Sequence, residues 1–149
     1  MNRAFESALT VRDIMTVDVK TASPDARVSD VVRIMIENEI GSVVIVGDKR
    51  EVLGIITERD LIRRVLARGL DPKAVKAEEI MSRPVITIEP DASVEEAANL
   101  MKEKGVGHLP VVESGRLVGI IAEGDILMLA PQFLEIVRIR AKRRRRGTL

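Results

Sequence analysis

The sequence has 149 residues, 46% of them hydrophobic, and a formal net charge of +1. Because it contains no cysteine and a single histidine, it excludes a disulfide framework, thiol catalysis and a cysteine- or histidine-based metal site. With no Trp, no Tyr and only two Phe, the chain predicts an aliphatic core and disfavours nucleic-acid recognition by base stacking on aromatic side chains.

The N-terminal segment, residues 1–10, lacks the apolar stretch of a signal peptide. No apolar run elsewhere reaches the length of about 20 residues that a transmembrane helix needs. We therefore expect a cytoplasmic protein that does not associate with membranes.

The first predicted elements follow this segment in a regular order. Residues 17–21 are expected to be extended, and residues 26–38 carry apolar side chains at helical spacing. Residues 42–46 and 52–57 are β-branched runs separated by a turn-rich stretch, which predicts a hairpin. Residues 58–69 read as a helix that ends on glycine. The chain thus predicts the order strand, helix, strand, strand, helix.

The same order returns about 66 residues later. The segment from Ile14 to Val28 aligns with that from Ile80 to Val94, sharing Ile-Met, Pro-Asp-Ala and the final Val. GIITERD at residues 54–60 aligns with GIIAEGD at residues 119–125, and SVEE at residues 93–96 opens a helix with a capping box. We interpret this as an internal duplication.

Each copy has only about 55 residues, so a single copy leaves apolar strand surface exposed. We therefore expect the two copies to pack together about a pseudo-two-fold axis, with a cleft where their edges meet.

This ordered repeat, with IM(T/S), PDA, GHLPVV and GIITERD each in place, resembles a tandem pair of CBS domains, the Bateman module. The resemblance implies an α/β (α+β) fold of two interlocked β-α-β-β-α repeats. The expected domains are a first CBS domain at 11–66, a linker at 67–79, a second CBS domain at 80–130 and a basic C-terminal helix and tail at 131–149. It further implies a homodimer that binds adenosine-containing ligands, here AMP, ADP or ATP, between its halves.

Local chemistry alone leaves two readings of Thr57 and Asp60: a helix cap, or a ligand site in which the carboxylate accepts ribose hydroxyls. By resemblance, Asp60 is expected to hold the ribose, with Thr57 and Arg59 near the α-phosphate. His108 is expected to face the phosphates. The remaining residues implied for this site surround the adenine: Ile55, Arg83, Pro84, Val85, Val106 and Gly107.

The second copy departs from this pattern, because Ala122 and Gly124 replace the threonine and the arginine. We therefore expect a weaker second site, formed by Val17, Val19, Ser42 and Asp125.

Catalysis is not expected, since the sequence offers no nucleophile–base pair, no Walker-type glycine loop and no metal-ligand cluster. The leading hypothesis is a regulatory nucleotide sensor without a catalytic cofactor. The alternative is an adaptor for nucleic acid or another polyanion. It rests on the contrast between an acidic body and a C-terminal cluster of five cations, Lys142, Arg143, Arg144, Arg145 and Arg146.

Overall fold

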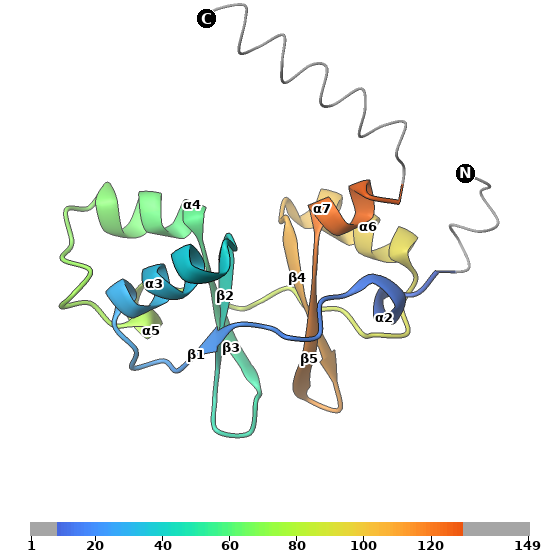
Figure 1. The fold of residues 1–149 in the computed structure, drawn as a ribbon, viewed down its shortest axis with the longest axis horizontal. Helices are drawn as coiled ribbons and strands as arrows, with labels where there is room; N and C mark the ends of the chain where they lie inside the picture. The colour runs from blue at the N-terminus through green and yellow to red at the C-terminus, as the bar shows by residue number, and fades with distance from the viewer. Residues whose placement is uncertain (1–8, 130–149) are drawn as a thin grey trace, which may run out of the picture.

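The computed structural model describes residues 9–129 (Figure 1). The predictions for residues 1–8 and 130–149, among them the C-terminal helix and the cluster of five cations, lie outside the described residues.

The first copy of the repeat forms a three-stranded sheet with helices packed against it. Strand β1 (Thr21–Ala22) runs parallel to β2 (Ser42–Val46), which pairs antiparallel with β3 (Val52–Thr57). Helix α3 (Val28–Asn38) buries its apolar stripe against the sheet. The predicted hairpin is therefore confirmed, whereas the extended run expected at 17–21 is reduced to β1.

The helix predicted after β3 consists of two parts. Helix α4 (Glu58–Asp60) continues directly into the π-helix η1 (Leu61–Leu66). Val65 of η1 is buried in the core of this half.

The second copy repeats this arrangement with a two-stranded sheet. Helix α6 (Val94–Lys104) precedes the antiparallel pair β4 (His108–Glu113) and β5 (Arg116–Ala122), and α7 (Glu123–Leu127) follows. The predicted capping box is confirmed, because the Ser93 hydroxyl accepts the Glu96 N–H at 3.0 Å and the Glu96 carboxylate accepts the Ser93 N–H at 3.0 Å. The α/β fold of two repeats is thus confirmed.

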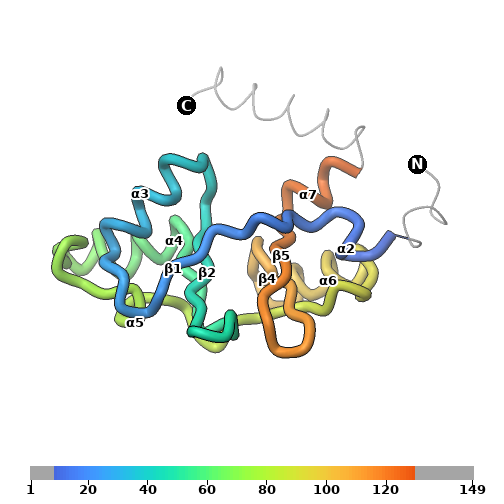
Figure 2. Tube along the Cα trace, turned by 60° about the horizontal axis from the view of Figure 1, so that its bottom comes forward, coloured from blue at the N-terminus to red at the C-terminus, as the bar shows by residue number. Residues whose placement is uncertain are grey.

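Two short helices are exchanged between the copies, because each precedes one copy in the sequence and packs against the other. Helix α2 (Val11–Ile14) lies against α6 and β5, and α5 (Ala77–Ile80) lies beside α3 and η1 (Figures 1 and 2). Val11 is fully buried among residues of the second copy, and Ala77 and Ile80 are buried among those of the first. We call α3, α4, η1, α5 and β1–β3 the first half, and α2, α6, α7, β4 and β5 the second half.

The exchanged segments also pair with strands. Ser82 and Ile55 exchange two backbone hydrogen bonds, of 2.8 and 3.1 Å, and Thr16 and Ile120 exchange two of 2.9 Å. Between the halves, Val44, Ile55 and Leu117 form a buried apolar cluster. The halves are therefore interlocked, as expected.

Candidate functional site

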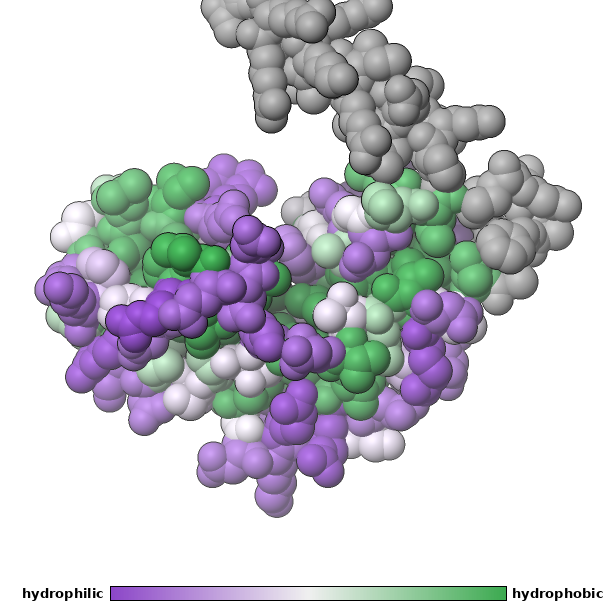
Figure 3. All heavy atoms as spheres, in the orientation of Figure 1, coloured by the Kyte–Doolittle hydropathy of each residue, from purple (hydrophilic) through white to green (hydrophobic). Residues whose placement is uncertain are grey.

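Strands β3 and β5 end on the same edge of the molecule, and α4 and α7 begin there (Figure 1). Figure 3 shows the molecule hollowed between the two halves on this edge. A cavity of 630 Å³, the first cleft, lies at the start of α4, and one of 390 Å³, the second cleft, lies at the start of α7. Residues of both halves line each cleft, so a ligand in either one contacts both halves.

Asp60 is the buried acid of the first cleft, with 8% of its surface exposed. Its Oδ2 accepts the Thr57 N–H at 2.9 Å and the Thr57 hydroxyl at 3.2 Å. Its Oδ1 accepts the Ser82 hydroxyl at 2.8 Å. The cap and the proposed ligand site are therefore formed by the same carboxylate.

Three arginines of α4 and η1 line the first cleft. The Arg64 guanidinium donates to the carbonyls of Ile80 and Met81, at 3.3 and 3.0 Å, and its Nε lies 3.7 Å from Asp60. Arg59 and Arg63 are exposed and have no hydrogen-bond or ion-pair partner among residues 9–129. Two guanidinium groups are thus available to an anionic ligand.

Two glutamates occupy equivalent places where the halves meet. The N–H of Glu58 donates to the Gly41 carbonyl at 3.1 Å, and that of Glu123 donates to the Gly107 carbonyl at 3.0 Å. Their side chains fold back over these glycines, where an added Cβ would approach them to 3.2 Å. Both glutamates also line the first cleft, so negative charge lies there beside the arginines.

His108 begins β4 and lines both clefts. Burial lowers the pKa of its imidazole, and the nearby carboxylates of Glu123, Glu58 and Asp125 oppose this shift. The side chain is therefore shared between the sites and is predominantly neutral near pH 7.

The second cleft has fewer available cations. Its lysine, Lys20, is paired with Asp18 at 3.0 Å. Asp125 accepts the Ala122 N–H at 2.8 Å, as Asp60 does from Thr57. The second cleft therefore offers an acid and apolar walls but no unpaired arginine or lysine among its lining residues.

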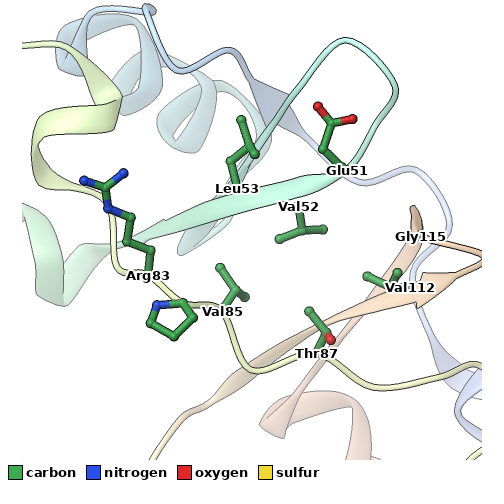
Figure 4. Close-up of a pocket in the computed structure, with 9 residues that line it drawn as sticks. Glu51, Val52, Leu53, Arg83, Val85, Thr87, Val112 and Gly115 are labelled. Carbon is green, nitrogen blue, oxygen red and sulfur yellow. The ribbon is translucent and has the colours of Figure 1, made fainter.

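Most of the residues expected at the first site line the first cleft. These are Ile55, Thr57, Arg59, Asp60, Val106, Gly107 and His108. Arg83, Pro84 and Val85 instead line a separate cavity of 760 Å³, between the β2–β3 hairpin and the segment after Ser82 (Figure 4). Because Ser82 pairs antiparallel with Ile55, the chain then runs back along β3 and away from Asp60.

Of the residues expected at the second site, Val19, Ser42 and Asp125 line the second cleft. Val17 does not line it, and 70% of the surface of this residue is exposed. The sequence did not single out five polar residues that line the first cleft: Glu58, Arg63, Arg64, Ser82 and Glu123. The third letter of the repeated IM(T/S) motif was the signal for Ser82.

A family model described as "CBS domain" matches residues 11–67 and 77–131. The chain belongs to the CBS domain family. Its two clefts are therefore those of a CBS-domain pair, and the resemblance found in the sequence is confirmed.

Similar proteins include an uncharacterized protein of Methanopyrus kandleri, MK0525, which is 42% identical over 137 residues, covering 91% of this chain and 70% of the relative. The CBS domain pair of protein MJ0100, solved in complex with 5′-methylthioadenosine and S-adenosyl-L-methionine, has a TM-score of 0.74 and 33% identity over 80% of this chain and 94% of that one. A hexameric CBS-CP12 protein from bloom-forming cyanobacteria has a TM-score of 0.76 and 33% identity, covering 86% and 74%.

Within residues 9–129, no three His, Asp or Glu side chains gather in a way that could hold a metal ion. No helix in this part of the chain has the length and apolar character needed to span a bilayer.

Proposed function

We propose that this CBS-domain pair is a non-catalytic regulatory module of the cytoplasm that binds an adenine nucleotide, AMP, ADP or ATP, in the first cleft. The observation that carries the proposal is the meeting of a buried acid, Asp60, with Arg59 and Arg63, two exposed arginines without a partner among residues 9–129, on one cleft wall. The acid suits a ribose and the arginines suit phosphates. The adenosyl ligands of the related MJ0100 pair support the choice of an adenosine compound.

The ligand acts by joining the two halves. One wall of the first cleft is the end of β3 and the start of α4, and the other is the start of β4 with Glu123 of α7. A nucleotide that contacts both walls favours the relative position of the halves that it fits best, and so shifts the population of conformations. The second cleft, built on Asp125, is the weaker nucleotide site, because no arginine is among the described residues that line it.

We further infer that the module forms a homodimer through an apolar face of the first half. Ile36 of α3 and Ile62 and Leu66 of η1 are 72%, 60% and 76% exposed. Figure 3 shows apolar side chains gathered over the helices of this half. A patch of large apolar side chains on a folded domain is typical of a protein interface.

The proposed function is tested by thermal unfolding with adenine and guanine nucleotides. Ligand at 100 times its Kd adds about 2.7 kcal/mol to the free energy of unfolding. For a chain of this size we expect a rise in Tm of about 5–10 °C with an adenine nucleotide, and a smaller one with its guanine analogue. No shift with any adenosine compound at millimolar concentration would refute the proposal.

A further inference from the structure

Asp60 and Asp125 occupy equivalent positions at the starts of α4 and α7, but their carboxylates differ in the number of donors they accept. Asp60 accepts three: the N–H and the hydroxyl of Thr57, and the hydroxyl of Ser82. Asp125 accepts the N–H of Ala122, and no other donor among residues 9–129 reaches it. The two carboxylates therefore differ in the number of acceptor positions that remain free for a ligand.

An ionised carboxylate has about four lone-pair positions for hydrogen bonds. A ribose with free 2′ and 3′ hydroxyls uses two of them when both hydroxyls donate to the same acid. Asp60 has one position left, whereas Asp125 has three. A second ribose hydroxyl can reach Asp60 only if one of its present donors leaves.

Ser82 is the donor that distinguishes the two sites. Its backbone is fixed on Ile55 by two hydrogen bonds, and its hydroxyl donates to Asp60 at 2.8 Å. The equivalent residue, Thr16, is fixed on Ile120 in the same way, yet its hydroxyl makes no hydrogen bond to Asp125 within the described part of the chain. The two halves therefore share the backbone hydrogen bonds. Among the described residues, the bond from the side-chain hydroxyl to the aspartate is present only in the first half.

We propose that Ser82 is a specificity-determining residue, which limits Asp60 to one ribose hydroxyl and makes the first cleft tolerant of a deoxyribose. This inference rests on the proposed function, and it concerns how the first cleft recognises the sugar. The first cleft then recognises its nucleotide mainly through the phosphates at Arg59 and Arg63. The second cleft, through Asp125, requires both hydroxyls.

The test compares AMP with 2′-deoxy-AMP and 3′-deoxy-AMP on the full chain. Amide signals of Arg59 and Asn38 in 15N–1H spectra report the first and the second cleft separately. In the unmodified protein, we expect one deoxy analogue to bind the first cleft within about threefold of AMP. At the second cleft, both analogues are expected to bind about tenfold or more weakly than AMP. This loss of affinity is typical of the loss of one hydrogen bond to a charged group.

Ser82→Ala frees a lone-pair position on Asp60. We expect its first cleft to discriminate against the tolerated analogue by about tenfold, because the second hydroxyl now binds Asp60. Ser23→Ala is the matched control, since it also removes a serine hydroxyl bonded to an aspartate, Asp25 at 2.6 Å, on an exposed loop.

The outcomes separate this inference from the function on which it rests. If no adenine nucleotide binds, both are wrong. A second outcome is that AMP binds while both deoxy analogues bind the first cleft of the unmodified protein about tenfold more weakly than AMP. In that case Ser82 does not limit the number of ribose hydroxyls that Asp60 accepts. An unchanged discrimination in Ser82→Ala leads to the same conclusion and leaves the proposed function standing.

Discussion

Met81 lies directly on Gly54, so that a Cβ added to Gly54 would approach the Met81 Cγ to 2.6 Å. The equivalent pair in the other half is Met15 on Gly119, where an added Cβ would lie 2.5 Å from Sδ. Each methionine follows an exchanged helix, α5 or α2, and each glycine lies in β3 or β5. The repeated Ile-Met and Gly-Ile-Ile motifs are therefore the two sides of one contact.

Gly54→Ala should destabilise the fold, because the new methyl group overlaps Met81 and the chain must shift. We expect a loss of about 1–3 kcal/mol in the free energy of unfolding, measured with denaturant. Combining it with Met81→Ala should give less than the sum of the two single losses, since the overlap is removed. Gly124→Ala is the control, because within residues 9–129 its added Cβ meets no atom within 4 Å beyond its neighbours and its own helix backbone. Equal effects at Gly54 and Gly124 would contradict this explanation.

Arg59→Ala should weaken AMP binding while leaving adenosine binding unchanged within about twofold. A guanidinium–phosphate hydrogen bond contributes about 1.5–3 kcal/mol, so a loss of tenfold or more in the Kd of AMP is expected by calorimetry. Arg33→Ala removes an exposed arginine of α3 that pairs with Asp30, and it serves as the control. An equal loss for adenosine and AMP would mean that Arg59 does not contact the phosphate.

His108 should make stability depend on pH in a defined window. Burial lowers its pKa in the folded state, so the unfolded chain takes up the proton first as the pH falls. Its contribution to stability is complete above the pKa of an unfolded histidine, about 6.5, and is lost as the pH falls from there through the folded pKa. We expect His108→Gln to flatten the dependence of Tm on pH between about 7 and 5. A variant as pH-dependent as the parent would refute this role.

Leu66→Asp should dissociate the proposed homodimer, because it places a charge on the exposed apolar face proposed to include Leu66, Ile36 and Ile62. Sedimentation velocity should show a dimer for the parent and a monomer for the variant, at unchanged helical content. Leu53→Asp is the control, since Leu53 is a 37% exposed apolar residue on the hairpin away from this face. A monomeric parent, or a variant that stays dimeric, would exclude this interface.

The sequence by itself determined the repeat, the two hairpins, the helices between them and the capping boxes. These depend on patterns within a few residues: β-branched runs around a turn, apolar side chains at helical spacing, and an acid three residues after a cap. They also placed Thr57, Arg59 and Asp60 together, because those residues lie on one helical turn. The resemblance to CBS domains added Val106, Gly107 and His108, which lie together at and just before the start of β4.

Only the tertiary structure decided which segments meet. No periodic pattern in the sequence predicts the exchange of α2 and α5 or the contact of Met81 with Gly54. The hydrogen bond from Ser82 to Asp60, which are 22 residues apart, is likewise not encoded by a local pattern. The tertiary structure also turned Arg83, Pro84 and Val85 away from the acid, because the antiparallel pairing of Ser82 with Ile55 sets the direction of the following chain. Local preferences fix the elements, whereas burial of apolar surface between the halves fixes their partners.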